Sequence, residues 1–226
     1  MGRSMMVAAA ILGLSAVAPA AAAETVARPA AAVRGHSVTH PVAHLAVRVP
    51  NSATYVGSDR FDLYGVADAE IQLFAESDRN RRLTRLYWIQ FESYWPSHPN
   101  NHYDYTGDRR ETHWGNTVWV NSGPGSTTTP PRPGGDRAHV QAMLEKAGYK
   151  APPEMMNVRM IQLLDDPKGT GHGRRELMFI YAEDLAKTGK TIADLTDAKG
   201  NTNAAWDPIG KALVKRATTA FQETRK

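Results

Sequence analysis

The chain has 226 residues and no cysteine, 42% of its residues are hydrophobic, and its formal net charge is +4. This composition lies near the globular average and excludes collagen-like, coiled-coil and wholly disordered chains. The absence of cysteine excludes disulfides, thiolate metal sites and cysteine nucleophiles. The small charge surplus excludes the basic stripe typical of nucleic-acid-binding proteins.

Residues 1–23 have the three parts of a secretory signal peptide. Arg3 supplies the positive start, residues 7–17 the apolar stretch, and residues 21–23 the small side chains before a cleavage site. The apolar stretch is shorter than the roughly 20 residues that a membrane-spanning helix needs. We therefore expect a bacterial exported protein, periplasmic or secreted, with no membrane span in its mature chain.

Residues 24–50 are rich in alanine and proline and show neither helical nor strand periodicity. We expect them to form a flexible tether ahead of a single domain over residues 51–226. The tether contains His36, His40 and His44 at intervals of four, but Pro41 disfavours the helix that would align them on one face.

Two β-rich runs follow. Residues 69–77 alternate apolar and polar side chains, and residues 82–95 are β-rich, which predicts an antiparallel hairpin around a polar turn. Residues 96–111 are a polar loop that leads into a strand over 112–121. Residues 122–135 contain four prolines and four glycines, which predicts an exposed loop.

The rest of the chain combines helices with a second hairpin. A helix is expected to follow Asp136, which can act as its N-cap, and to end before Gly148, with Val140, Met143, Leu144 and Ala147 at helical spacing. Residues 157–165 and 174–184 are β-rich and enclose a turn-forming segment, which predicts the second hairpin.

Two more helices are expected near the C-terminus. Thr191 and Asp194 have the spacing of a capping box, and Asp207 followed by Pro208 starts a C-terminal helix with one apolar stripe. Hairpins joined by few helices predict an α+β fold, in which an antiparallel sheet carries helices packed on one face.

Three histidines, His98, His102 and His113, fall on the polar loop and at the start of the strand after it. Catalytic zinc takes three protein ligands and keeps one position open for a water whose pKa the metal lowers. A zinc-dependent hydrolase with Asp104 or Glu92 as its base is therefore one hypothesis. The alternative is a surface loop whose histidines bond to backbone or water, with no cofactor.

Trp88, Gln90, Glu92 and Tyr94 share one face of the 82–95 strand, because alternate residues of a strand point the same way. Together with Trp114, they mix aromatic and polar groups as ligand-binding concavities do. The alternative is that helices cover this face and that the aromatic rings are core. Glu92, within an apolar strand, is either a general acid or base, or the partner of an arginine on the next strand.

No P-loop, dinucleotide fingerprint or nucleophile elbow occurs in the sequence. We therefore expect an exported protein that binds a small, partly apolar ligand without catalysis. The alternatives are an envelope protein that pairs with another protein through exposed hairpin edges, and the metal-dependent hydrolase. The expected partner is a small molecule or an envelope protein.

Overall fold

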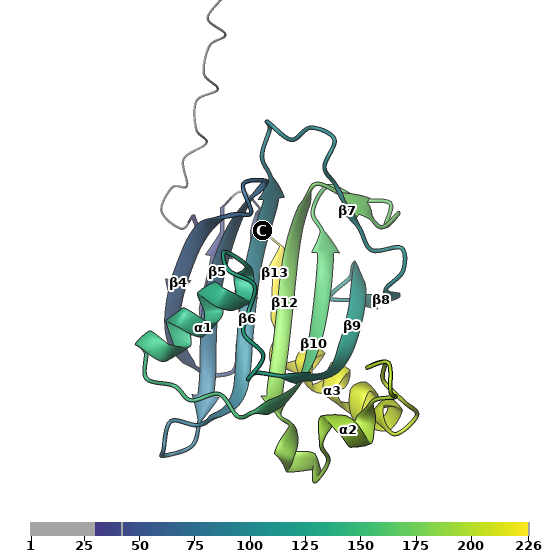
Figure 1. The fold of residues 1–226 in the computed structure, drawn as a ribbon. Coiled ribbons are helices and arrows are strands. Elements are labelled where there is room, and N and C mark those ends of the chain that lie inside the picture. The colour runs from purple at the N-terminus through teal and green to yellow at the C-terminus, as the bar shows by residue number, and fades with distance from the viewer. Residues whose placement is uncertain (1–29, 42, 226) are drawn as a thin grey trace, which may run out of the picture.

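The computed structural model describes residues 30–41 and 43–225, so the predicted signal peptide lies outside the described residues. Within them, two antiparallel sheets pack face to face, and a short two-stranded ribbon lies at one end (Figure 1). The large sheet has the order β4-β5-β6-β12-β10-β9-β8, and the small sheet has the order β1-β2-β3-β13.

The strands have the following bounds. The large sheet contains β4 (Thr54–Leu63), β5 (Ala67–Ser77), β6 (Leu83–Tyr94), β8 (Arg109–His113), β9 (Asn116–Ser126), β10 (Glu154–Leu163) and β12 (Arg175–Asp184). The small sheet contains β1 (Ala32–Arg34), β2 (Ser37–His40), β3 (Leu45–Arg48) and β13 (Gln222–Arg225). The ribbon pairs β7 (Tyr103–Asp104) with β11 (His172–Gly173).

The helices of the described chain are α1 (Asp136–Lys146), α2 (Ile192–Leu195) and α3 (Trp206–Ala220), with a 3-10 turn η1 (Leu185–Thr188). The predicted capping box of α2 is confirmed, since Thr191 and Asp194 bond to each other's backbone N–H. The predicted N-caps of the other two helices, Asp136 and Asp207, are wrong: the N-caps are Gly135 for α1 and Ala205 for α3, and both aspartates lie in the first turn of their helix.

The main core lies between the two sheets. We call the face of the large sheet that meets the small sheet its inner face. Phe74, Tyr87 and Phe179 of the large sheet pack there with Val47 of the small sheet and Phe221 after α3. The rings of Phe179 and Phe221 lie 5.2 Å apart. These contacts hold the inner face of the large sheet against the small sheet and α3.

Helix α1 covers part of the opposite face of the large sheet, which we call the α1 face (Figure 1). Val140 and Leu144 of α1 pack over Ile71 and Leu73 of β5 and over Trp88 of β6. Tyr149, which follows α1, is buried in the same cluster. Val140 and Leu144, four residues apart on one face of α1, thus meet the alternating apolar side chains of a strand.

The predicted α+β fold with helices on one sheet face is wrong. The structure is 47% strand and 17% helix, with a sandwich-like, β-rich architecture of three sheets. The second layer is mainly a sheet, because residues 32–48 and 222–225 pair as strands. Their strands have three or four residues, which is too short to show a clear alternation.

The expected tether of residues 24–50 is therefore incorrect over 32–48, where β1, β2 and β3 lie. Val38, Leu45 and Val47 of these strands are at most 1% exposed, so the segment is part of the core. In the described chain, no helix combines the length and apolarity needed to cross a membrane.

Candidate functional site: a cavity between the sheets

A cavity of about 500 Å³ opens between the two sheets, where β6 ends and β12 begins. Its wall takes residues from both sheets and from the connection between β2 and β3. The volume lies within the range of small-molecule pockets.

Two rows of residues across the inner face form the floor. Asp68 of β5, Ser93 of β6 and Arg175 of β12 are opposite one another in the sheet register. Glu70 and Phe91 form the next row. Since directly opposed residues of an antiparallel pair point to the same face, these side chains lie side by side.

The small sheet contributes the opposite wall. The His40 ring at the end of β2 stacks on Phe91 with ring centroids 4.0 Å apart. Burial lowers the pKa of His40, an effect that the charge of Glu70 partly opposes. The imidazole is therefore neutral at pH 7 and presents a flat, largely apolar surface beside Phe91.

The carboxylate of Glu70 holds the start of the described chain against the cavity. It accepts hydrogen bonds from the backbone N–H groups of Ala30 and Ala31, at 2.6 and 2.7 Å. It also accepts a bond from the Gln72 amide at 3.1 Å. These three donors satisfy a carboxylate that is only 3% exposed, so its charge is already compensated.

Three guanidinium groups line the cavity, and they differ in their partners. Arg60 forms an ion pair with Asp68, and Arg225 donates to Gln162 and forms an ion pair with Glu223. By contrast, the Arg175 guanidinium makes no hydrogen bond or ion pair with any residue that the structure describes. Arg175 is therefore a cationic group with all its donors available to a ligand.

Behind the floor, on the α1 face, two carboxyl groups oppose each other. Glu92 of β6 and Glu176 of β12 are register partners and are 8% and 1% exposed. The hydroxyl of Tyr103 donates to Glu92 at 2.5 Å, and the hydroxyl of Tyr105 donates to Glu176 at 2.6 Å. Both glutamates also contribute to the cavity wall.

This pair holds a proton at neutral pH. Burial raises the pKa of Glu176 to about 8, and the neighbouring charge of Glu92 adds to the effect. Burial also raises the pKa of Glu92. Burial is the largest cause of both pKa shifts, because a desolvated place disfavours the ionised carboxylate, and for Glu176 the neighbouring charge of Glu92 adds to it.

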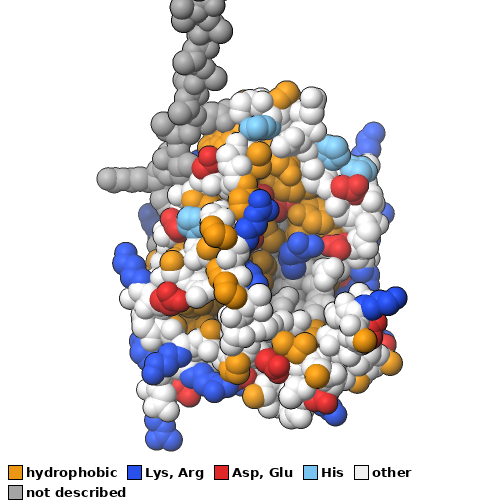
Figure 2. Space-filling view, viewed as in Figure 1, with side chains coloured by type: hydrophobic (Ala, Val, Ile, Leu, Met, Phe, Trp, Pro, Cys, Tyr) orange, Lys and Arg blue, Asp and Glu red, His pale blue; other side chains and the backbone are white. Residues whose placement is uncertain are grey.

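The residues predicted to bind a ligand are placed in two groups. Trp88, Gln90 and Glu92 form a hydrogen-bonded chain along the α1 face, because the Trp88 indole donates to Gln90 and the Gln90 amide donates to Glu92. Tyr94 stacks on Tyr103 with centroids 4.4 Å apart. Of this group, Glu92 lines the cavity. In Figure 2, hydrophobic side chains gather over the middle strands of the α1 face, with Lys or Arg among them.

Trp114 lies elsewhere. Its ring packs 4.9 Å from Phe179 on the inner face, and its indole N–H donates to the Phe221 carbonyl at 3.0 Å. Trp114 thus joins the β8–β9 turn to the end of α3, at a distance in the fold from the Trp88 chain. Its backbone φ of 51° places it in the left-handed region of this tight turn.

The three histidines of the predicted zinc site have separate partners. His98 bonds through Nε2 to the Gly65 carbonyl at 3.0 Å, and His113 bonds to Glu111 at 2.6 Å. His102 lies beside His172, with ring centroids 5.8 Å apart. Among the described residues, no group of three or more His, Asp or Glu is arranged to hold a metal ion.

The loop that carries these histidines is fixed by Arg174. The Arg174 guanidinium donates to four backbone carbonyls of the loop, at 2.6 to 3.1 Å: those of Trp95, His98, Pro99 and Asn101. This anchor, together with the β7–β11 ribbon, places Tyr103 and Tyr105 over the two carboxyl groups.

The sequence offers Arg175 only as a candidate partner of Glu92, along with Arg159 and Arg174, and it does not indicate that Arg175 and His40 line a pocket. Arg175 directly precedes a β-rich run that contains Glu176, a pattern with no specific chemical meaning by itself. His40 falls in the segment expected to be a tether, and its place in a pocket depends on the pairing of β2 with β3, which strands of four residues do not indicate. No local signal brings either residue to Phe91.

Comparison of the chain with protein-family models, with curated proteins and with solved structures finds no match. The geometry of the site is therefore the basis for assigning a function.

Proposed function

We propose that this protein binds a small, partly apolar ligand carrying an acidic group in the cavity between its two sheets. The proposal depends on one observation: the cavity places the unpaired Arg175 guanidinium near the apolar surfaces of Phe91 and Leu164. Binding without catalysis accounts for the site, because the carboxyl groups of its wall, those of Asp68, Glu70, Glu92 and Glu176, already have hydrogen-bond partners within the protein.

The polar groups of the wall favour an acidic ligand at Arg175. Asp68 and Glu70 accept from Arg60 and from three N–H donors, and the pair of Glu92 and Glu176, which shares one proton, accepts from the hydroxyls of Tyr103 and Tyr105. Arg175 is the lining cation whose donors have no partner among the described residues, and its planar fork matches a carboxylate. The apolar part of the ligand would lie against Phe91, which supports the expectation of an amphipathic molecule.

Octanoate and 1-octanol are matched probes for this arrangement, since they share a chain and differ in the charged head. Calorimetric titration of the wild type should show tighter binding of octanoate than of 1-octanol. Arg175→Gln should weaken octanoate about fivefold to tenfold, equivalent to about 1 kcal/mol, because the lost contact is partly solvated. The affinity for 1-octanol should stay unchanged.

Arg79→Gln is the control, since Arg79 lies on the exposed turn between β5 and β6, at the other end of these strands. Equal affinity of the wild type for both probes, or equal losses in the two variants, would contradict an anion site at Arg175. Failure of both probes to bind would contradict a cavity for amphipathic acids.

We also propose that the protein is exported, on the basis of the sequence pattern over residues 1–23. Mass spectrometry of the protein recovered from the periplasm or medium of a bacterial host should find a mature chain that starts at Glu24. An uncleaved chain retained in the cytoplasm would contradict export. A metal-dependent hydrolase is not proposed, since the three histidines lie with separate partners.

A further inference from the structure

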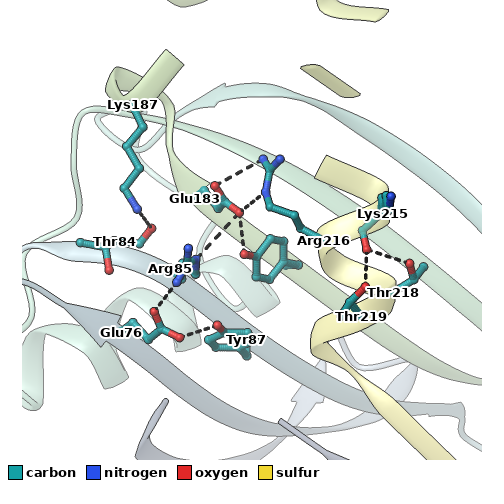
Figure 3. Close-up of polar contacts among 11 residues, drawn as sticks. Glu76, Thr84, Arg85, Tyr87, Glu183, Lys187, Lys215, Arg216, Thr218 and Thr219 are labelled. Carbon is teal, nitrogen blue, oxygen red and sulfur yellow. Dashed lines mark hydrogen bonds and ion pairs between the residues drawn. The ribbon is translucent and has the colours of Figure 1, made fainter. Parts of the chain in front are cut away.

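A second pocket lies at the opposite end of the same strands, between α3 and the inner face of the large sheet (Figure 3). Its volume is about 380 Å³. It is separated from the cavity at Phe91 by the stretch of β6 that starts at Arg85, and successive residues of a strand advance by about 3.3 Å. The two pockets are therefore distinct.

A row of charged residues crosses three strands at the base of this pocket, and Glu76 and Arg85 of that row line it. Glu76 of β5, Arg85 of β6 and Glu183 of β12 are opposite one another in the register. Arg85 donates through Nη1 to Glu76 at 2.7 Å, and its Nε lies 3.9 Å from a Glu183 oxygen. Arg216 of α3 approaches the same row and donates to Glu183 at 2.7 Å.

Both carboxylates of the row are fully engaged. Glu76 accepts from the hydroxyls of Tyr87 and Ser52, at 2.6 and 2.7 Å, as well as from Arg85. Burial raises the pKa of Glu76, but these hydrogen bonds more than offset that effect, so its net pKa is lowered. Glu76 therefore stays ionised, and its carboxylate oxygens are satisfied by these three donors.

Glu183 is engaged in the same way. The Tyr181 hydroxyl donates to it at 2.5 Å, and Arg216 donates through both Nε and Nη2 (Figure 3). Glu76 and Glu183 thus each receive hydroxyl and guanidinium donors, and neither carboxylate lacks a partner.

The cations of the pocket, by contrast, have donors left over. Arg85 Nε is buried and makes no hydrogen bond with the described residues, and a Glu183 oxygen lies 3.9 Å from it. Lys215 lines the pocket from α3, and its ammonium group makes no hydrogen bond or ion pair with the described residues. Three cations, Arg85, Lys215 and Arg216, face two carboxylates, and Lys187 adds charge nearby by bonding to the Thr84 carbonyl.

We infer that this pocket binds a phosphate group, held by Arg85, Lys215 and Arg216. Donors that converge from a strand and from a helix suit an anion with oxygens in several directions better than a flat carboxylate. The rim residues Ser52, Lys215 and Thr219 are exposed, so the group can be a free ion or the end of a larger ester.

The test is calorimetric titration with inorganic phosphate, glycerol 3-phosphate and acetate at constant ionic strength. Inorganic phosphate should bind in a 1:1 ratio and more tightly than acetate. Tight binding of glycerol 3-phosphate as well would identify an esterified phosphate as a suitable ligand, and its weaker binding would identify the free ion.

Lys215→Gln should weaken phosphate binding at least fivefold, and Arg85→Lys should weaken it while keeping the charge, since that change replaces the guanidinium fork with a single ammonium group. Lys211→Gln is the control, because Lys211 is exposed on the same helix and does not line the pocket. Urea unfolding of each variant checks that it folds.

The inference is overturned by any of three results. One is no phosphate binding at millimolar concentration. Another is binding of acetate as tight as that of phosphate. The third is an equal loss of affinity in the Lys215 and Lys211 variants, which would indicate general charge attraction instead of a site.

Discussion

The buried carboxyl pair makes the stability of the protein depend on pH in a direction that can be worked out. Glu176 has a pKa near 8 in the folded protein against 4.5 when solvated. The contribution of protonated Glu176 to the free energy of unfolding is therefore fully present below pH 4.5, and it is lost as the pH rises through about 8. Between these limits the unfolding free energy falls by about 1.4 kcal/mol per pH unit from this group, because the folded state binds one more proton.

Glu176→Gln removes this titration and keeps the shape of the side chain. The Gln oxygen can still accept from Tyr105, so the fold at the pair is preserved. The wild type should lose on the order of 4 kcal/mol between pH 5 and pH 8 relative to the variant. The groups that face Glu176 are Glu92, Tyr105, Arg159 and Asp136. After burial, the charge of Glu92 is the largest cause of the raised pKa of Glu176.

Urea unfolding of both proteins at pH 5, 6, 7 and 8 measures this difference from midpoints and slopes. Glu145→Gln serves as the matched control, since Glu145 is exposed on α1 and should follow the wild-type profile. Parallel pH profiles for the wild type and Glu176→Gln would refute the reasoning, because they would mean that Glu176 is ionised in both states.

Three further changes test other parts of the fold. Arg174→Ala should raise the hydrogen-exchange rate of residues 95–101 by about tenfold or more, since it removes the donors that anchor that loop. Unchanged exchange would show that another contact anchors the loop. Gly210→Ala should lower the free energy of unfolding in urea by about 1–3 kcal/mol, because the new Cβ would lie 2.7 Å from Trp206 Nε1. Alanine has the better helix propensity, so a gain in stability would contradict this packing. Phe221→Ala should cost about 3–5 kcal/mol by the same measurement, and a loss below 1 kcal/mol would show that the site relaxes.

Local patterns predicted much of the secondary structure correctly. The hairpin over 69–95 corresponds to β5 and β6, and the pairing of the two runs over 157–184 corresponds to β10 and β12. The helix expected from Asp136 and the capping box at Thr191 are also present. These features depend on residues close in the chain, so alternation, caps and turn residues suffice to identify them.

The candidate site was only partly predictable. The sharing of one face by Trp88, Gln90, Glu92 and Tyr94 follows from strand periodicity and is confirmed by the register. The partner of Glu92 did not follow from periodicity. An arginine on the next strand was one expectation, whereas the structure places Glu176 there, with a tyrosine from the loop donating to each carboxyl group.

By itself, the sequence determined the composition class, the two hairpins, the main helices and the alternation that separates the faces of β6. The tertiary structure alone decided that β6 pairs with β12, which joins the two hairpins and brings Glu92 to Glu176 and Arg85 to Glu183. It also decided that residues 32–48 form a second sheet with β13. The physical reason is that pairing between distant strands depends on the apolar area buried over the whole core. The periodicity of a short stretch of sequence does not contain that information.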